Sequence, residues 1–189
     1  PAQEPKVLGY QVVRSYPHDV TSYTQGLEFH DGIFYESDGE YGGSSLRKVE
    51  PATGKVLQKV DIGRDIFAEG LTIIDNKLIQ LTWENKFGIV WDKTSFKQLS
   101  QFPYQSSSLG WGLAFDGKRI YKSDGSNSIY FLNKDNYSEE GFIEVYNNAG
   151  PVDQLNELEF IDGKIYANIY QSDVIVIIDP QTGAVTGKI

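Results

Sequence analysis

One pattern recurs four times along the 189 residues, and it constrains the fold more than any other feature. An apolar segment entered through Gly-Leu or Glu-Leu is followed by a two-residue turn and a second segment rich in Ile, Leu, Tyr and Phe. The turns are Asp31-Gly32, Asp75-Asn76, Asp116-Gly117 and Asp162-Gly163. Such pairs between apolar runs predict type I′ β-hairpins, because both central residues of that turn take positive φ.

A second hairpin follows each of the first ones, so that every repeat comprises four antiparallel strands. Pro-x-Thr-Gly turns beginning at Pro51 and Pro180 mark this second hairpin in the first and last repeats. The repeats start near residues 24, 68, 110 and 155. Four strands in roughly 40 to 50 residues are the signature of a β-propeller blade. We therefore predict an all-β chain of four-stranded antiparallel blades, with residues 1–189 forming a single propeller domain.

The segment ahead of the first repeat reads as one further strand over residues 6–16, in which apolar residues such as Val7 and Tyr10 alternate with polar ones. An N-terminal strand of a propeller often completes the last blade, and we expect the same here. Two arrangements stay open after four repeats: a four-bladed ring, or a larger ring whose last blade is incomplete in this chain. A β-sandwich would also fit the strand content, although it would not explain the matched registers.

Composition disfavours several classes of function. Seventeen Lys and Arg against 26 Asp and Glu give a formal net charge of −9, which argues against nucleic-acid binding driven by phosphate neutralisation. The absence of Cys removes thiolate metal sites and cysteine nucleophiles. No apolar run approaches the roughly 18 residues that a membrane span requires. The two histidines, His18 and His30, show no zinc-type spacing, and we expect neither a metal nor another cofactor.

One position of the repeat varies in a way that suggests a site. The residue immediately before the Gly-Leu or its equivalent is Gln25, Glu69, Trp111 or Asn156. Equivalent ends of the inner strands meet around the central channel of a propeller, so these side chains are expected to converge. Glu69 has no cation beside it in the sequence, and a carboxylate among apolar residues must be paired, exposed or used.

Aromatic residues follow two of these positions at equal distances. Trp83 comes after Glu69 and Tyr170 comes after Asn156, each near the end of the second strand of its hairpin. Aromatic walls with a few polar groups are the usual form of a small-ligand site. A simpler interpretation stays open: the polar residues line a channel rim, and the rings fill the interfaces between blades.

Motifs in every repeat resemble one known family. Taken in order, "YPHDVTSYTQGL", "FAEGLT", "LTW", "GWGLAFDGK", "YKSDGS" and "LNELEFIDGKIYANIYQSD" are similar to the plant- and bacterial-type glutaminyl-peptide cyclotransferases, also called glutamine cyclotransferases. The resemblance runs from about Tyr16 to Ile189. It implies a five-bladed propeller, here with an incomplete last blade. It also implies an acyltransferase that converts N-terminal glutamine to pyroglutamate, releases ammonia and needs no metal.

The resemblance also implies residue roles. Glu69 corresponds to the catalytic glutamate, which would pass a proton from the attacking amine to the departing nitrogen. Asn156 corresponds to a catalytic asparagine, which would donate a hydrogen bond to the γ-oxygen. The implied substrate-binding residues are Tyr23, Gln25, Phe67, Trp83, Trp111 and Tyr170. Tyr170 stands where the family has a tryptophan, and the lysine-bearing segment of the family's fifth blade has no counterpart in this sequence.

The same resemblance implies partners and a location. The substrates would be peptides or proteins with an N-terminal glutamine, without nucleic acid or a membrane span, and the enzyme would be a monomer. The location would be extracytoplasmic, either secreted or periplasmic, with a lipid-anchored precursor as one form. A non-catalytic propeller scaffold that binds peptides or proteins is the alternative function. A metal-dependent propeller hydrolase is disfavoured, because only Glu69 is anionic among the four matched positions.

Overall fold

A computed structural model describes residues 2–189, and regular structure in that range consists of β-strands alone. This confirms the all-β class, and the sheets described below, each built on four antiparallel strands with a fifth, parallel strand added to the last one, are the blades of an all-β propeller. The described residues contain no helix that is long and apolar enough to cross a bilayer. The strands group into two compact units, each of which is named here after one of its site residues.

The Glu69 unit comprises residues 12–104 and 108–110, and it contains the first two repeats. Its first sheet consists of β2 (Thr24–His30), β3 (Ile33–Asp38), β4 (Ser45–Val49) and β5 (Val56–Asp61). Its second sheet consists of β6 (Ala68–Ile74), β7 (Lys77–Thr82), β8 (Phe87–Asp92) and β9 (Gln98–Pro103). In both sheets the strands follow one another in sequence order, as successive hairpins require.

Burial in the Glu69 unit explains the sequence pattern of its strands. Every residue of β6 is buried, whereas β5 alternates between half-buried and exposed residues. A strand covered on both faces reads as a continuous apolar run, and an edge strand with one wet face alternates. The core of this unit includes Tyr35, Leu46, Ala68, Leu71, Leu78, Ile89 and Trp91.

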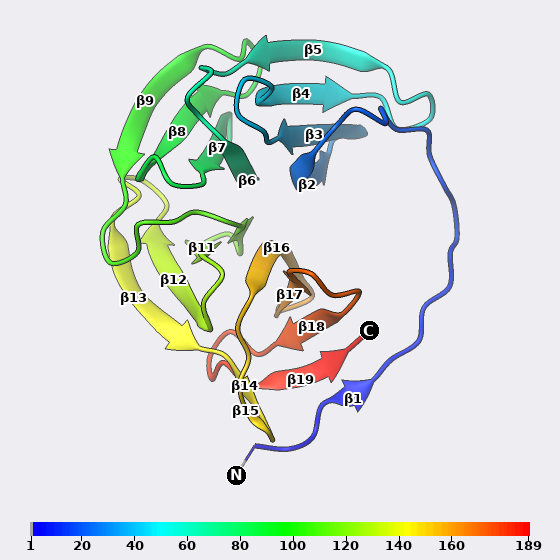
Figure 1. The fold of residues 1–189 in the computed structure, drawn as a ribbon, viewed down its shortest axis with the longest axis vertical. Coiled ribbons are helices and arrows are strands. Elements are labelled where there is room, and N and C mark those ends of the chain that lie inside the picture. Colours follow the sequence, from blue (N-terminus) through cyan, green and yellow to red (C-terminus); the bar gives the residue numbers. More distant parts are fainter. Residues whose placement is uncertain (1) are drawn as a thin grey trace. The chain divides into compact units, whose positions relative to one another are not determined.

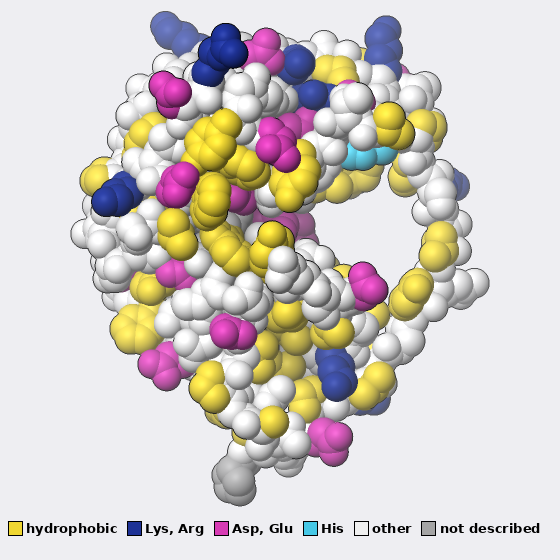
Figure 2. Space-filling view, viewed as in Figure 1, with side chains coloured by type: hydrophobic (Ala, Val, Ile, Leu, Met, Phe, Trp, Pro, Cys, Tyr) yellow, Lys and Arg dark blue, Asp and Glu magenta, His cyan; other side chains and the backbone are white. Residues whose placement is uncertain are grey.

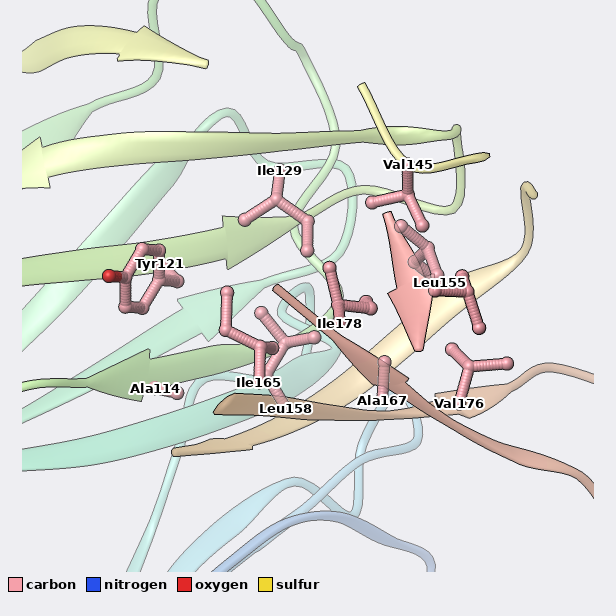
Figure 3. Packing of buried hydrophobic residues seen from close by; sticks show 11 residues of the cluster. Ala114, Tyr121, Ile129, Val145, Leu155, Leu158, Ile165, Ala167, Val176 and Ile178 are labelled. Carbon is pink, nitrogen blue, oxygen red and sulfur yellow. The ribbon is translucent and has the colours of Figure 1, made fainter. Parts of the chain in front are cut away.

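The Asn156 unit comprises residues 2–11, 105–107 and 111–189, and it contains the last two repeats. Its first sheet consists of β10 (Leu113–Phe115), β11 (Arg119–Ser123), β12 (Ser128–Asn133) and β13 (Glu139–Glu144). Its second sheet consists of β16 (Leu155–Ile161), β17 (Lys164–Ile169), β18 (Ile175–Ile178) and β19 (Val185–Lys188), joined by β1 (Lys6–Val7). A short pair, β14 (Tyr146–Asn147) and β15 (Gly150–Pro151), lies between the two sheets in sequence. Figure 3 shows Ile129, Leu158, Ile165 and Ile178 from these two sheets packing into one core.

The N-terminal strand is shorter than the one predicted over residues 6–16. Strand β1 covers only Lys6–Val7, and it adds in parallel to the edge strand β19 of the fourth repeat (Figure 1). The side chains of Tyr10 and Val13 are 82% and 90% exposed. Beyond residue 8 this segment therefore has no partner strand, and without inter-strand hydrogen bonds its alternating residues do not form a strand.

The type I′ prediction holds at two of the four turns. Both central residues have positive φ at Asp31-Gly32 (50° and 80°) and at Asp162-Gly163 (48° and 81°). At the other two turns only one residue of each pair, Gly117 or Asp75, has positive φ, so the prediction was wrong there. The Asp116 carboxylate accepts backbone N–H groups two and three residues further on. This side-chain bonding stabilises a different turn from the one that the Asp-Gly pair indicates.

Candidate active site

The residues at the varying position of the repeat lie at irregularities in the first strand of their sheets. The pairing register shifts between Thr24 and Gly26, between Ala68 and Leu71, and between Leu155 and Leu158. Gln25, Glu69 and Asn156 lie inside these three shifts. A β-bulge leaves an extra residue without a ladder partner and re-aims its side chain, and bulges are frequent next to active sites. The equivalent positions of these repeats therefore lie at β-bulges, which the sequence did not reveal.

Trp111 occupies the corresponding place at the start of the third sheet. Its backbone N–H donates to the Ser123 carbonyl at 3.0 Å, and the Ser123 N–H donates to the Gly112 carbonyl at 3.0 Å. Two consecutive residues therefore pair with one residue of β11, as in a bulge. The indole lies against Gly125, where an added Cβ would come within 2.6 Å of it. Tyr170 packs edge-on against the same indole, with ring centroids 5.2 Å apart.

An aromatic cluster in the Glu69 unit contains three of the predicted substrate-binding residues. The Phe67 ring makes edge contacts with Tyr23 at 6.0 Å and with Trp83 at 5.6 Å between centroids. Tyr41, which was not predicted, adds a fourth ring at 5.5 Å from Phe67 and 6.4 Å from Trp83. Tyr23 and Tyr41 are 45% and 46% exposed, and Figure 2 shows hydrophobic side chains exposed beside acidic ones over this part of the unit.

Gln25 lies next to this cluster across a glycine. An added Cβ on Gly39 would come within 2.4 Å of the Phe67 ring and 3.0 Å of the Gln25 Cγ. The Gly39 N–H also donates to the Tyr23 carbonyl at 2.9 Å. The loop after β3 therefore comes close enough to hold Phe67 and Gln25 side by side only because residue 39 has no side chain.

The Glu69 carboxylate is buried in this unit, with 5% of the residue exposed. Its side chain makes no hydrogen bond or ion pair among residues 2–189. Burial raises its pKa to about 9, because removal from water disfavours the charged form. A hydrogen bond to Glu84 raises the pKa of Tyr41 to about 12, and the charge of Glu69 adds to that effect. A carboxyl group with a pKa raised in this way is suited to giving and taking protons near neutral pH.

A second tyrosine near Glu69 also escaped the sequence analysis. The Tyr104 hydroxyl donates to the Thr82 carbonyl at 2.6 Å and accepts the Thr82 N–H at 2.9 Å, so it satisfies the backbone where β7 ends. Burial raises the pKa of Tyr104, with a smaller contribution from the charge of Glu69. Neither Tyr41 nor Tyr104 lies at a position that recurs in the other repeats, so self-alignment gave no signal for them.

Asn156 lies half-buried in the Asn156 unit, and its backbone and side chain have different environments. Its backbone carbonyl accepts a hydrogen bond from the Ser123 hydroxyl at 2.5 Å. Its side-chain amide makes no hydrogen bond within the described part of the chain. Both N–H groups of the amide are therefore available to a ligand.

The predicted site residues are divided between the two units. The Glu69 unit contains Tyr23, Gln25, Phe67, Glu69 and Trp83, and the Asn156 unit contains Trp111, Asn156 and Tyr170. Inside each unit the structure brings the predicted aromatic residues into contact. Residues 2–189 contain no cluster of three or more His, Asp or Glu side chains arranged to hold a metal ion.

Three comparisons place the chain among known proteins. It is 39% identical over 183 residues to a glutaminyl-peptide cyclotransferase of Arabidopsis thaliana, a match that covers 95% of this chain and 56% of the relative. The chain thus spans about half the length of that relative. The crystal structure of Myxococcus xanthus glutaminyl cyclase matches with a TM-score of 0.90 and 35% identity, covering 98% of this chain and 78% of the other.

A more distant structure agrees in fold alone. The WD40 domain of Neurospora crassa Pan2 matches with a TM-score of 0.61 at 12% identity, covering 89% of this chain and 50% of that one. The family model described as glutamine cyclotransferase matches residues 1–189. The chain belongs to the glutamine cyclotransferase family.

Proposed function

We propose that this chain carries the acid/base machinery of a glutaminyl-peptide cyclotransferase, which converts an N-terminal glutamine to pyroglutamate and releases ammonia. The observation that carries the proposal is Glu69, a buried carboxyl group at a β-bulge with its pKa raised to about 9. The names of the Arabidopsis and Myxococcus relatives support the same reaction.

Glu69 moves the proton that this reaction must transfer. The α-amino nitrogen attacks the γ-amide carbon of the same glutamine, so a bond forms to that nitrogen and the bond to the amide nitrogen breaks. The Glu69 carboxylate takes a proton from the attacking amine and returns it to the departing nitrogen, which leaves as ammonia. A positioned acid/base group contributes roughly 10²- to 10⁴-fold to such a step. Burial makes the ionised carboxylate a stronger base than one in water.

Asn156 stabilises the negative charge that develops on the γ-oxygen. Its side-chain N–H groups are without partners in the described residues, and a β-bulge sets its place on β16. A fixed amide donor aimed at a developing oxyanion is worth roughly 10²- to 10³-fold in rate. The role requires no proton transfer, so an amide with no titration serves it at every pH.

The aromatic residues shape the flexible substrate so that its two ends meet. In the proposal, Phe67, Trp83 and Tyr23 provide flat walls beside the acid, and Trp111 and Tyr170 provide walls beside the amide. Gln25, next to Phe67, holds the substrate by hydrogen bonds. Holding the two reacting groups in contact raises the rate, because the translational and rotational entropy is already lost on binding and no longer adds to the barrier.

The proposal extends to assembly and location. We infer from the family that residues 1–189 belong to a single five-bladed propeller domain, in which the sheets of the four repeats are four of the blades. The protein acts as a monomer on peptides or proteins with an N-terminal glutamine. Its location is extracytoplasmic, either secreted or periplasmic, with a lipid-anchored precursor as one form.

Substrate chemistry tests the proposed reaction. The purified chain is incubated with a glutamine-initiated peptide, with the same peptide acetylated at its amine, and with an asparagine-initiated peptide. We expect ammonia release and a pyroglutamyl product, detected by mass spectrometry, from the first peptide alone. Turnover of the acetylated peptide would contradict attack by the α-amine. A folded chain that binds the first peptide without turning it over would favour the non-catalytic scaffold.

A further inference from the structure

The β-bulge that carries Asn156 is held from the neighbouring sheet of the same unit. The Ser123 hydroxyl, on β11, donates to the Asn156 carbonyl at 2.5 Å and accepts the Gly112 N–H at 2.8 Å. Ser123 is fully buried, with 0% of the residue exposed. One hydroxyl therefore bridges the backbone just before β10 to the backbone of the bulge in β16.

The bridge depends on a close approach of two backbones. An added Cβ on Gly112 would lie 2.1 Å from the Asn156 carbonyl oxygen and 2.7 Å from the Glu157 Cα. Contacts under 3.0 Å to backbone atoms force the backbone itself to move. Gly112 is thus the residue that lets the bulge sit against the third sheet.

The second residue of the bulge makes a parallel link. The Glu157 Oε1 accepts the Leu113 N–H at 3.2 Å and the Leu158 N–H at 3.1 Å. A bulge leaves backbone groups without ladder partners, and these need other partners when they are buried. Side chains of Ser123 and Glu157 supply those partners on either side of the Asn156–Glu157 peptide.

We propose that Ser123 is a positioning residue for Asn156: its hydroxyl, together with the close approach at Gly112, fixes the bulge and thereby the direction of the Asn156 amide. The inference rests on the proposed function, in which that amide binds the γ-oxygen. Without the hydroxyl the Asn156 carbonyl loses its donor, and the bulge peptide can rotate. Small displacements of a group that binds a transition state are costly, about 10²-fold for about 1 Å.

The first test separates positioning from general stability. Ser123→Ala is compared with Ser37→Ala, which also removes a fully buried hydroxyl; within residues 2–189 that hydroxyl accepts a hydrogen bond from the Gln80 side chain and contacts no bulge carbonyl. We expect Ser123→Ala to lower kcat about 10- to 100-fold with KM within about twofold. Ser37→Ala should lower the melting temperature and leave kcat unchanged. Equal kcat in the two variants would overturn the inference.

A second pair of variants approaches the same point from the backbone. Gly112→Ala places a methyl group against the Asn156 carbonyl, whereas Gly63→Ala meets only the Ile66 Cδ1 at 3.7 Å. We expect about 10²-fold lower kcat for Gly112→Ala and wild-type kcat for Gly63→Ala. Wild-type kcat in Gly112→Ala would show that the close approach has no bearing on the amide.

An NMR measurement keeps the inference testable if the wild type has no turnover, an outcome that would contradict the proposed function alone. The side-chain amide signals of Asn156 are assigned by their loss in Asn156→Ala. We expect these signals to shift in Ser123→Ala and to stay in place in Ser37→Ala. Unshifted signals in a folded Ser123→Ala protein would mean that the hydroxyl does not orient the amide.

Discussion

Glu69 and Asn156 both lie at β-bulges, but the two bulges have different surroundings. Glu69 is the second residue of a strand that is buried at every residue, and its carboxyl group makes no hydrogen bond among residues 2–189. Asn156 is half-buried, and its bulge is anchored through backbone groups by Ser123. A bulge fixes where a side chain starts, while its surroundings decide whether the site offers an acid of raised pKa or a stationary donor.

Replacing the acid should have the largest effect on activity. We expect Glu69→Gln to lower kcat roughly 10²- to 10⁴-fold, because the amide cannot carry the proton between the two nitrogens. The matched control is Glu159→Gln, since burial also raises the pKa of the Glu159 carboxyl group, which lies on β16 beyond the bulge. Steady-state ammonia release measures both variants. Equal losses of kcat in the two variants would show that Glu69 has no specific catalytic role.

Removing the amide should cost somewhat less. Asn156→Ala should lower kcat roughly 10²- to 10³-fold, because the developing oxyanion loses one fixed donor. Asn168→Ala removes an exposed amide of β17, directly opposite the same bulge, and should keep wild-type rates. The same ammonia assay compares the two. A loss of less than about tenfold for Asn156→Ala would contradict the role of its amide as the donor to the oxyanion.

The free energy of unfolding should depend on pH through the carboxyl group of Glu69, whereas the side chain of Asn156 should make no contribution to that dependence. Because burial raises the Glu69 pKa from 4.5 to about 9, the folded protein binds this proton more tightly than the unfolded chain does. The contribution of Glu69 to the free energy of unfolding is therefore fully present below pH 4.5 and falls as the pH rises toward about 9. Urea unfolding across that range should show a weaker decline for Glu69→Gln than for the wild type. Asn156→Ala should retain the wild-type decline, and a matching change in both variants would break the comparison.

The smallest effects are expected at the exposed edge of the aromatic cluster. Tyr41→Phe keeps the ring beside Phe67 and Trp83 but removes the hydroxyl that donates to Glu84. An exposed hydrogen bond contributes little, so KM should change less than about threefold. Tyr41→Ala removes the ring and should raise KM for a glutamine-initiated peptide several-fold. Identical KM values for the two variants would exclude the Tyr41 ring from substrate binding.

Local patterns accounted for the strands and for the equivalence of the site positions. Alternation and Asp-Gly pairs act over a few residues, and they predicted the four-stranded sheets. Alignment of the repeats with one another predicted that Gln25, Glu69 and Asn156 occupy equivalent positions of their repeats. The same patterns overextended the N-terminal strand, because alternation without a partner strand does not form a ladder. They also missed Tyr41, whose loop belongs to one repeat only.

The sequence by itself determined the all-β repeats, the family and the residue types available for proton transfer and hydrogen bonding. Only the tertiary structure decided that these residues lie at bulges, that Glu69 is withdrawn from water and that a serine of β11 holds the Asn156 backbone. The physical reason is the separation along the chain over which each effect acts. Turn and strand preferences arise between near neighbours in the chain, whereas register shifts, desolvation and close backbone approach arise between strands far apart in sequence.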